Sequence, residues 1–305
     1  MNYNKKKAIN AIAAFIVIVI GSYVIVAQQT IAGEWKATDR LRDDSSDDSI
    51  YLSMTWTRGK GTNRNGRTYK FSELDGLSAS SVINGKATFR LIREAGTFEF
   101  QGQFTNGTGE GTFRFDPAMG FVDAMRSRGI DIMAEGRKSE QTLEEKLYTA
   151  AMLNVTTTLA DDLISSGFGK LDLDDLIKAA IFKIDGRFMA EMKATGFPGL
   201  TMEELVKARI FKIDADYVRA INAAGFSNLG FEGVVKFAIF KVTPEFLNEL
   251  RNAGLTSFTA EEVVKFRIFK IDADFIREAK AADPNITSEE LVRRRLGVGR
   301  LRSTN

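Results

Sequence analysis

The tripeptide Ile-Phe-Lys occupies residues 181–183, 210–212, 239–241 and 268–270, so successive occurrences begin 29 residues apart. A fixed period of about 20 to 50 residues is typical of repeat proteins, in which each unit stacks on its neighbours. The spacing therefore predicts a tandem array of repeats over residues 142–302.

Each repeat is predicted to be a pair of short helices. The first helix opens with a capping box such as Thr201 with Glu204, and the second begins at a residue such as Asp214, whose side chain can accept from free backbone N–H groups. The second helix ends at a glycine, as at Gly225, which suits a left-handed C-cap. The equivalent residues elsewhere are Asp172 with Asp175, Thr259 with Glu262, Thr287 with Glu290, Asp185, Thr243, Asp272, Gly196 and Gly254. Helices of about ten residues are marginal alone, so stacking has to supply most of their stability.

Two apolar ladders recur with the same period, one from each helix of the pair. Stacking brings equivalent residues of neighbouring repeats together, so these ladders predict the continuous core of an α-solenoid. The first ladder is Leu176, Leu205, Val234, Val263 and Leu291. The second ladder is Phe188, Tyr217, Phe246 and Phe275.

A basic ladder in the first helices follows an acidic residue by four positions in every repeat. This order favours ion pairs within one helix, so we expect intrahelical pairs on a solvated face. The pairs are Asp174 with Lys178, Glu203 with Lys207, Glu232 with Lys236, Glu261 with Lys265 and Glu289 with Arg293.

A second basic ladder, formed by Lys183, Lys212, Lys241 and Lys270, has no acidic residue four positions before it. We interpret these four lysines as a solvated face. The alternative is a contact surface, because an aligned row of cations can bind a partner. No residue is assigned a catalytic, cofactor-binding or metal-binding role.

Residues 33–117 change from a helical period to a period of two. Ile50, Leu52, Met54 and Trp56 alternate with polar residues, as in a strand with one buried face. The same alternation continues in Phe89, Leu91, Phe98, Phe100, Phe104, Phe113 and Phe115. Short turn-forming stretches at 94–96 and 106–109 predict hairpins, and the whole unit is a small antiparallel meander. Its aromatic stripe is interpreted as core, with a ligand-lined concavity as the alternative and barrel closure left open.

The N-terminus carries Lys5, Lys6 and Lys7 before an apolar run at residues 8–27. Roughly 20 apolar residues are enough to span a bilayer, which favours a retained membrane anchor over a cleaved signal peptide. Cleavage after Ala32 is the alternative. In either case the lysines stay inside, so the bulk of the chain is expected outside the cytoplasm.

Composition removes several kinds of chemistry. The chain has no histidine and no cysteine, which excludes Ser-His-Asp and Cys-His catalysis, the usual zinc sites and disulfides. A net charge of +2 gives no reason to expect nucleic acid as a partner. The acidic stretch at residues 43–48 lacks the glycine and closing glutamate of a calcium-binding loop, so we interpret it as a solvated loop. No cofactor is expected.

The C-terminal tail is strongly basic. We expect it to be a frayed end whose cations are favoured near a helix C-terminus, with binding to anionic lipid or an envelope polymer as the alternative. Its arginines are Arg293, Arg294, Arg295, Arg300 and Arg302.

The expected fold class is α+β, in four segments. These are a membrane anchor or signal segment at 1–32, an antiparallel β domain at 33–117, a connecting helix and linker at 118–141, and a helical repeat domain at 142–305.

The phrase at residues 241–255, Lys-Val-Thr-Pro-Glu-Phe-Leu-Asn-Glu-Leu-Arg-Asn-Ala-Gly-Leu, resembles repeats in bacterial envelope proteins. In these proteins a small β unit, similar to the one ending at residues 115–117, precedes helix-pair repeats, and such repeats also trail some BlaR-type membrane metallopeptidases. The peptidase motif needs histidines and is absent here. The resemblance implies an accessory or sensor-like role outside the cytoplasm.

The function expected from these observations is that of a membrane-tethered, noncatalytic scaffold that binds a protein partner in the cell envelope. A sensory module, which binds a small or polymeric ligand of unknown identity and signals to a membrane partner, is the second hypothesis. A hydrolase that uses paired carboxylates is the third.

Overall fold

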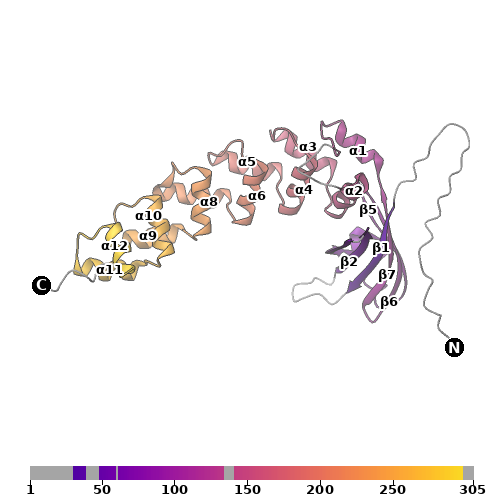
Figure 1. Cartoon of the computed structure of the whole chain (residues 1–305), viewed down its shortest axis with the longest axis horizontal. Helices are drawn as coiled ribbons and strands as arrows, with labels where there is room; N and C mark the ends of the chain where they lie inside the picture. The colour runs from indigo at the N-terminus through magenta and orange to yellow at the C-terminus, as the bar shows by residue number, and fades with distance from the viewer. Residues whose placement is uncertain (1–29, 39–47, 60, 134–140, 298–305) are drawn as a thin grey trace, which may run out of the picture.

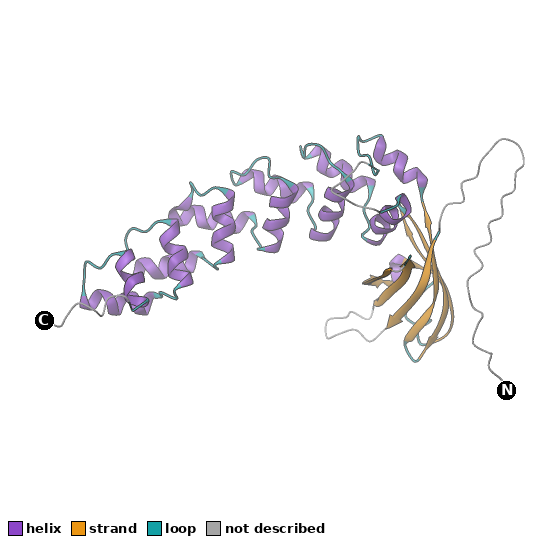
Figure 2. Cartoon of the chain, in the orientation of Figure 1, coloured by secondary structure: helices purple, strands orange, loops and turns teal. Residues whose placement is uncertain are grey.

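The computed structural model describes residues 30–38, 48–59, 61–133 and 141–297. Within them a curled, seven-stranded antiparallel sheet is followed by twelve helices, so the α+β prediction is confirmed (Figure 1). Strands and helices occupy separate parts of the molecule, and the helices extend away from one end of the sheet (Figure 2). The apolar run at 8–27, most of the acidic stretch at 43–48, and Arg300 and Arg302 lie outside the described residues.

The sheet has the strand order β3-β2-β1-β7-β6-β5-β4, with every neighbouring pair antiparallel. Its strands are β1 (Ile31–Thr38), β2 (Ser49–Arg58), β3 (Gly61–Lys70), β4 (Leu74–Asp75), β5 (Asn84–Arg93), β6 (Gly96–Thr105) and β7 (Thr108–Pro117), with a short 3-10 turn at Phe71–Glu73. β3 and β4 are the two edges, and no ladder joins them within the described residues. The sheet is therefore curled but open.

The predicted alternation is confirmed, because one face of the sheet is lined by buried apolar side chains. The indole of Trp35 packs against Phe89 and Phe104, with ring centroids 5.3 and 5.6 Å apart. The other residues of this face named from the sequence, from Ile50 to Phe115, are also buried. These rings pack on one another, which supports the interpretation of the aromatic stripe as core.

The turn between β6 and β7 is tighter than the predicted four-residue loop. Only Asn106 and Gly107 lie between the strands, with φ of 49° and 77°. Positive φ at both positions is the signature of the two-residue turns that match the twist of a hairpin.

The helices are α1 (Met119–Arg126), α2 (Leu143–Met152), α3 (Thr157–Ser165), α4 (Leu173–Phe182), α5 (Gly186–Ala194), α6 (Met202–Ile210), α7 (Ala215–Ile221), α8 (Phe231–Ile239), α9 (Pro244–Asn252), α10 (Ala260–Ile268), α11 (Ala273–Ala282) and α12 (Ser288–Arg295), and α7 continues into a wider turn at Asn222–Phe226. The even-numbered helices from α4 to α12 begin 28 or 29 residues apart. Contacts run within each row, as between α4 and α6 or between α3 and α5.

The predicted helix caps are confirmed. Thr201 accepts from the Glu204 N–H while the Glu204 carboxylate accepts from the Thr201 N–H, at 3.3 and 2.8 Å. The same reciprocal box opens α4, α10 and α12, and Asp185, Asp214, Thr243 and Asp272 cap the second helices. Gly196, Gly225 and Gly254 have φ of 102°, 94° and 95°. Local sequence thus sets where almost every helix starts and stops.

The two apolar ladders are buried to different degrees. The ladder from Leu176 to Leu291 is fully buried in every repeat. In the second ladder Phe188 and Phe246 are buried, whereas Tyr217 and Phe275 are half-buried.

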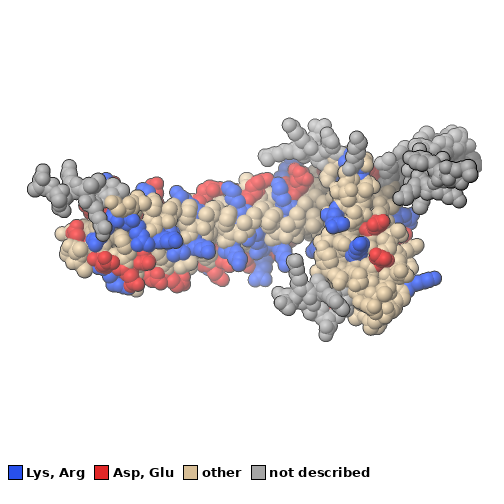
Figure 3. Space-filling model, turned by 60° about the horizontal axis from the view of Figure 1, so that its bottom comes forward, with Lys and Arg blue, Asp and Glu red and all other residues tan. Residues whose placement is uncertain are grey.

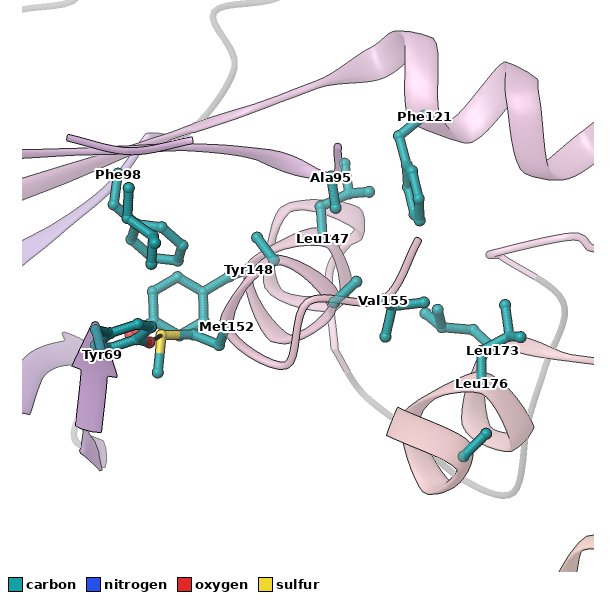
Figure 4. Packing of buried hydrophobic residues seen from close by; sticks show 14 of the residues in the cluster. Tyr69, Ala95, Phe98, Phe121, Leu147, Tyr148, Met152, Val155, Leu173 and Leu176 are labelled. Atoms are coloured by element: carbon teal, nitrogen blue, oxygen red, sulfur yellow. Dashed lines mark hydrogen bonds between the residues drawn. The ribbon is translucent and has the colours of Figure 1, made fainter. Parts of the chain in front are cut away.

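Helix α2 joins the helical part to the sheet. Figure 4 shows the ring of Tyr148 between Phe98 of β6 and Tyr69 of β3. Its centroid lies 5.2 Å from that of Phe98 and 5.5 Å from that of Phe115. The buried apolar cluster that contains the sheet runs without a break through α2 and onward to Val235 in α8. The sheet and the first helices therefore share one core.

Polar contacts fix the same junction. Arg58 at the end of β2 forms an ion pair of 2.6 Å with Glu145, whose side chain is buried. Arg67 of β3 donates to the carbonyl of Met152 at 3.2 Å, at the C-terminal end of α2. Burial strengthens such charged contacts, so they orient α2 on the sheet.

The intrahelical pairs predicted for the first basic ladder are wrong for Lys178 and Lys207. Lys178 pairs with Glu203 at 2.8 Å and Lys207 with Glu232 at 2.7 Å, so each lysine binds a carboxylate on the next helix of its row. These carboxylates raise the pKa of both lysines. Stacking brings the acidic first turn of one helix beside the last turn of the preceding helix. In α12 the expected pair does form within one helix, between Glu289 and Arg293 at 2.7 Å.

Neighbouring repeats are also tied by arginines that lie over aromatic rings. The guanidinium of Arg209 in α6 lies 3.7 Å from the ring centroid of Phe188 in α5 and donates to the Lys183 carbonyl at 2.6 Å. Arg267 and Arg295 make the same kind of contact with Phe246 and Phe275. We call these contacts the arginine ties.

One interface uses a different tie. The residue equivalent to Arg209 in α8 is Ala238, and the aromatic residue before it is Tyr217. The Tyr217 hydroxyl donates to the Val242 carbonyl at 2.8 Å. A tyrosine hydroxyl thus bridges the two repeats where no arginine is present.

The described arginines of the basic tail also make contacts within the helical part. Arg293 pairs with Glu289, Arg294 donates to the Ala279 carbonyl at 3.4 Å, and Arg295 donates to the Phe269 carbonyl at 3.1 Å. Arg294 and Arg295 therefore bind α12 to the preceding helix pair, whereas the Arg293 pair lies within α12. None of the described helices is long and apolar enough to cross a membrane.

Candidate functional site

The four candidate lysines share one unusual backbone position. Lys183, Lys212, Lys241 and Lys270 follow the first helices with φ of 54°, 56°, 54° and 52°, in the left-handed region. The next residue donates its N–H to a carbonyl five positions back, as from Ile213 to Ala208 at 2.7 Å, and its side chain is buried. This is the Schellman end of a helix, in which glycine is the usual left-handed residue.

The second helices that follow Lys183, Lys212 and Lys241 do end on glycine, whereas α11, which follows Lys270, ends at Asp283 in an extended conformation. Gly196, Gly225 and Gly254 all have positive φ, as does Gly167 after α3. A residue with a Cβ pays roughly 1 kcal/mol or more in this region, and a cation at a helix C-terminus recovers about 0.3–1 kcal/mol. Local energetics therefore give lysine no advantage over glycine at the ends of the first helices.

The ammonium groups of these lysines point to solvent without partners. All four residues are exposed, and within the described residues none of their side chains has an ion pair or hydrogen bond. They differ in this from Lys178 and Lys207, whose charges are used between helices. The second basic ladder is thus free to contact something outside the fold.

An apolar row accompanies the lysines. Ile181, Ile210, Ile239 and Ile268 are 50%, 53%, 47% and 47% exposed, and each is the last or next-to-last residue of a first helix. Water-exposed isoleucine at one equivalent position in four repeats is a feature that packing does not require. We call the four Ile-Phe-Lys tripeptides together the Ile-Phe-Lys ledge.

The isoleucine row was not recognised as a surface from the sequence, where the tripeptide served only to mark the period. A signal was present. Ile181 follows the buried Leu176 by five positions, which turns its side chain about 140° away around a helix of 100° per residue. An isoleucine so far from the buried stripe is expected to face solvent.

Hollows lie beside the ledge at both of its ends. One of about 430 Å³ lies between α8 and α10 and is lined by Ile239, Lys241, Arg267 and Lys270. The other, of about 340 Å³, is lined by Ile181 and Lys183 on the helical side and by Asn65, Gly66 and Arg67 of β3. The ledge therefore offers apolar and cationic groups around concave surface, and it reaches the edge of the sheet.

The wider surface is mixed in charge. Figure 3 shows both basic and acidic side chains along the helical part on this face. A partner recognised here would accordingly need local complementarity to the ledge, because the net charge of +2 supplies little long-range attraction.

A third hollow, of about 450 Å³, is lined by a carboxyl whose pKa is shifted. Burial and the neighbouring Asp172 raise the pKa of Asp175, which lines this hollow. Asp175 already accepts from the Asp172 N–H in the capping box of α4. Its environment is explained by that structural role. Across the described residues, no group of three or more Asp or Glu side chains is placed to hold a metal ion.

No protein-family model matches this chain, and no curated protein matches it.

Proposed function

We propose that this chain is a noncatalytic, membrane-tethered interaction protein whose helix pairs form an α-solenoid and whose Ile-Phe-Lys ledge binds a protein partner outside the cytoplasm. The observation that carries the proposal is the row of four exposed isoleucines beside four unpaired, left-handed lysines. Such a row presents one apolar and one cationic group per repeat.

The solenoid part of the proposal is supported by contacts that repeat along the array. First helices contact first helices and second helices contact second helices, and each described interface from α5 onward has an arginine or tyrosine tie. Nearest-neighbour contacts of this kind are what a linear stack of repeats requires.

The partner expected at the ledge is a protein segment that presents apolar side chains and carboxylates at matching intervals. Covering one half-exposed isoleucine contributes roughly 1 kcal/mol, about half of the ~1.5–3 kcal/mol for a full side chain. Axes of packed helices are about 8–10 Å apart, so the four repeats extend the ledge over roughly 30 Å. A segment of that length could gather several such contributions.

Tethering and location rest on the sequence. The lysines at 5–7 before the apolar run at 8–27 support an orientation with the bulk of the chain outside the cytoplasm. The noncatalytic part is supported by the absence of histidine and cysteine from all 305 residues, which removes the common nucleophile–base pairs.

The test measures affinity and thermal stability of the same variants, so loss of binding at the ledge is distinguished from loss of folding. A partner is first captured by crosslinking in cells to the full-length chain, and its affinity is then measured with purified components. Replacing Lys183, Lys212, Lys241 and Lys270 together by glycine removes the charges and relieves the left-handed strain. We expect binding to weaken roughly tenfold or more, at equal or higher thermal stability.

A matched apolar pair sharpens the result. Ile210→Ser and Ile239→Ser remove ledge side chains, whereas Ile164→Ser removes an isoleucine of α3 that is similarly exposed, at 41%, and lies off the ledge. The proposal requires loss of affinity in the first two variants and none in the third. Unchanged affinity in all ledge variants refutes it.

A further inference from the structure

Strand β3 is a long edge with almost no cover. It spans ten residues and every residue except Tyr69 is exposed. Among the strands that the structure describes, it pairs only with β2. Its counterpart at the other edge, β4, has only two residues. An exposed edge of this length presents a row of backbone groups that another strand can pair with.

The hydrogen-bond phase identifies which backbone groups face outward. The Phe71 N–H donates to the Asp48 carbonyl at 3.0 Å, which makes this pair a hydrogen-bonded one in the register of β2 and β3. Hydrogen-bonded pairs alternate with non-bonded pairs in an antiparallel ladder. The N–H and C=O groups of the even-numbered residues of β3 therefore point away from β2.

These outward groups have no partner over most of the strand. Thr62, Arg64, Gly66 and Thr68 make no backbone hydrogen bond outside the β2–β3 ladder among the described residues. The outward N–H of Lys70 is occupied, because it donates to the Glu73 carboxylate at 3.0 Å. Four consecutive outward positions are thus open to a strand of about eight residues.

The side chains of β3 itself are basic or neutral, and the acidic residues Asp48 and Glu73 lie beyond its C-terminal end. β3 carries Arg64, Arg67 and Lys70 and no carboxylate. The residues opposite its even positions on β2 are Ser49, Tyr51, Ser53, Thr55 and Thr57, which are uncharged. Two copies of this edge would bring like charges together, which disfavours pairing of the chain with itself. An acidic strand would instead bring its carboxylates beside these basic side chains, which favours pairing.

The middle of the edge opens onto space. Asn65, Gly66 and Arg67 line the hollow of about 340 Å³ whose far wall includes Ile181 and Lys183. Gly66 has no side chain to project, and the hydroxyl of Tyr51 lies over the position where its Cβ would be. A side chain of an added strand can enter this hollow and reach the first lysine of the ledge.

We propose that β3 is a strand-addition site that takes an extended, acidic segment of a partner protein. Backbone pairing to Thr62, Arg64, Gly66 and Thr68 supplies the attachment, and Arg64 and Lys70 select carboxylates. Main-chain hydrogen bonds with side-chain selection at alternate positions are the general mode of strand addition. The site is separate from the proposed function of the ledge and does not depend on it.

The test uses two fluorescein-labelled decapeptides, Thr-Glu and Thr-Lys each repeated five times, with the full-length chain at low salt. We expect the acidic peptide to bind at least tenfold more tightly by fluorescence anisotropy. In a sample labelled with ¹⁵N-threonine and ¹⁵N-glycine, hydrogen exchange at the amides of Thr62, Gly66 and Thr68 should slow when it binds. Binding through side chains alone, as an anionic polymer would bind, leaves these amides unprotected and overturns the proposal.

A backbone variant provides the second measurement. Thr68→Pro removes an outward N–H and leaves the β2 ladder intact, since proline is tolerated on an edge whose N–H faces solvent. Thr68→Ala retains the N–H and is the matched control. We expect tenfold weaker binding of the acidic peptide for the proline variant relative to the alanine variant. Where the proline variant melts earlier than its control, Arg64→Glu with Lys70→Glu replaces it, and equal affinity in these variants also overturns the proposal.

Failure at this site and failure at the ledge are distinguishable. The Ile210→Ser and Ile239→Ser variants leave β3 unchanged, so they should bind the acidic peptide as the unaltered chain does.

Discussion

The arginine tie between α5 and α6 can be exchanged for the tyrosine tie that the chain uses elsewhere. Arg209→Ala removes a guanidinium that lies 3.7 Å from the Phe188 ring centroid and donates to the Lys183 carbonyl at 2.6 Å. The ring contact contributes about 0.5–1 kcal/mol and the charged hydrogen bond about 1.5–3 kcal/mol, before losses. The buried Arg209 Nε has no partner within the described residues, which offsets part of this gain. We expect a net loss of about 1–2 kcal/mol.

Adding Phe188→Tyr to Arg209→Ala should restore about 1 kcal/mol. The new hydroxyl lies where that of Tyr217 lies one repeat later, and its acceptor is the Ile213 carbonyl, equivalent to that of Val242. The double variant then has the tyrosine and alanine pair that Tyr217 and Ala238 already form.

Urea titration followed by circular dichroism measures the stability, and hydrogen exchange of peptides covering α5 and α6 measures local opening. The second readout is needed because repeat arrays do not always unfold in one step. Arg187→Ala is the control, since the Arg187 side chain is 86% exposed and, among the described residues, pairs only with Glu191 on its own helix. The reasoning is refuted by equal losses for Arg187 and Arg209, or by a double variant no more stable than Arg209→Ala.

Three further outcomes follow from the sheet and its junction with α2. Tyr148→Phe should leave thermal stability unchanged or raise it by about 1 kcal/mol, because the buried hydroxyl has no hydrogen bond of normal geometry among the described residues; a loss above that size contradicts this. Burial raises the pKa of Tyr69 and of Tyr148 to about 12, whereas both side chains titrate near 10 in the unfolded chain. As the pH rises, the unfolded chain therefore releases these protons before the folded chain does. The free energy of unfolding should fall by up to about 2 kcal/mol per residue between about pH 10 and 12, and by less in Tyr148→Phe. Gly111→Ala should lower the free energy of unfolding, measured by calorimetry, by about 3 kcal/mol, because the new Cβ would lie 2.0 Å from the Gln101 carbonyl oxygen. The control is Gly120→Ala in α1, whose Cβ meets nothing within 4 Å, so this change should be neutral or stabilising.

The parts of the fold that were predictable from the sequence are those set by local chemistry. The capping box at Thr201 and the glycine end at Gly196 each depend on residues within one turn, so their sequence spacing is sufficient. Alternation around Trp56 likewise reports a buried strand face. The α+β class follows from these local patterns.

Other features depend on which segments meet in space. The partner of Lys178 is Glu203 because stacking brings α4 and α6 together. Four-residue spacing predicts only pairs within one helix, so it could not predict this contact. β3 was missed because nine of its ten residues are exposed, so it has no apolar alternation to recognise. The place of Tyr148 inside the sheet also depends on contacts distant in sequence.

The candidate site was predictable in part. Lys183, Lys212, Lys241 and Lys270 were chosen because they lacked an acidic neighbour in sequence, and the structure describes all four as exposed. Their left-handed backbone could not be expected from residue type, since lysine seldom occupies that region. The companion isoleucines were already in the tripeptide and needed only a comparison with the buried helical stripe.

The position of Tyr148 inside the sheet also limits where such a chain can be divided or extended during evolution. A break between Pro117 and Leu143 would leave the aromatic face of the sheet without its helix, so the sheet and α2 have to be inherited as one piece. Farther along, most of the helices carry their own caps, and helices 29 residues apart contact one another. Duplication or loss of one 29-residue unit would change the reach of the molecule by one helix pair while leaving the junction with the sheet untouched. A change in length is therefore tolerated among the C-terminal helix pairs and not at the junction between the sheet and α2.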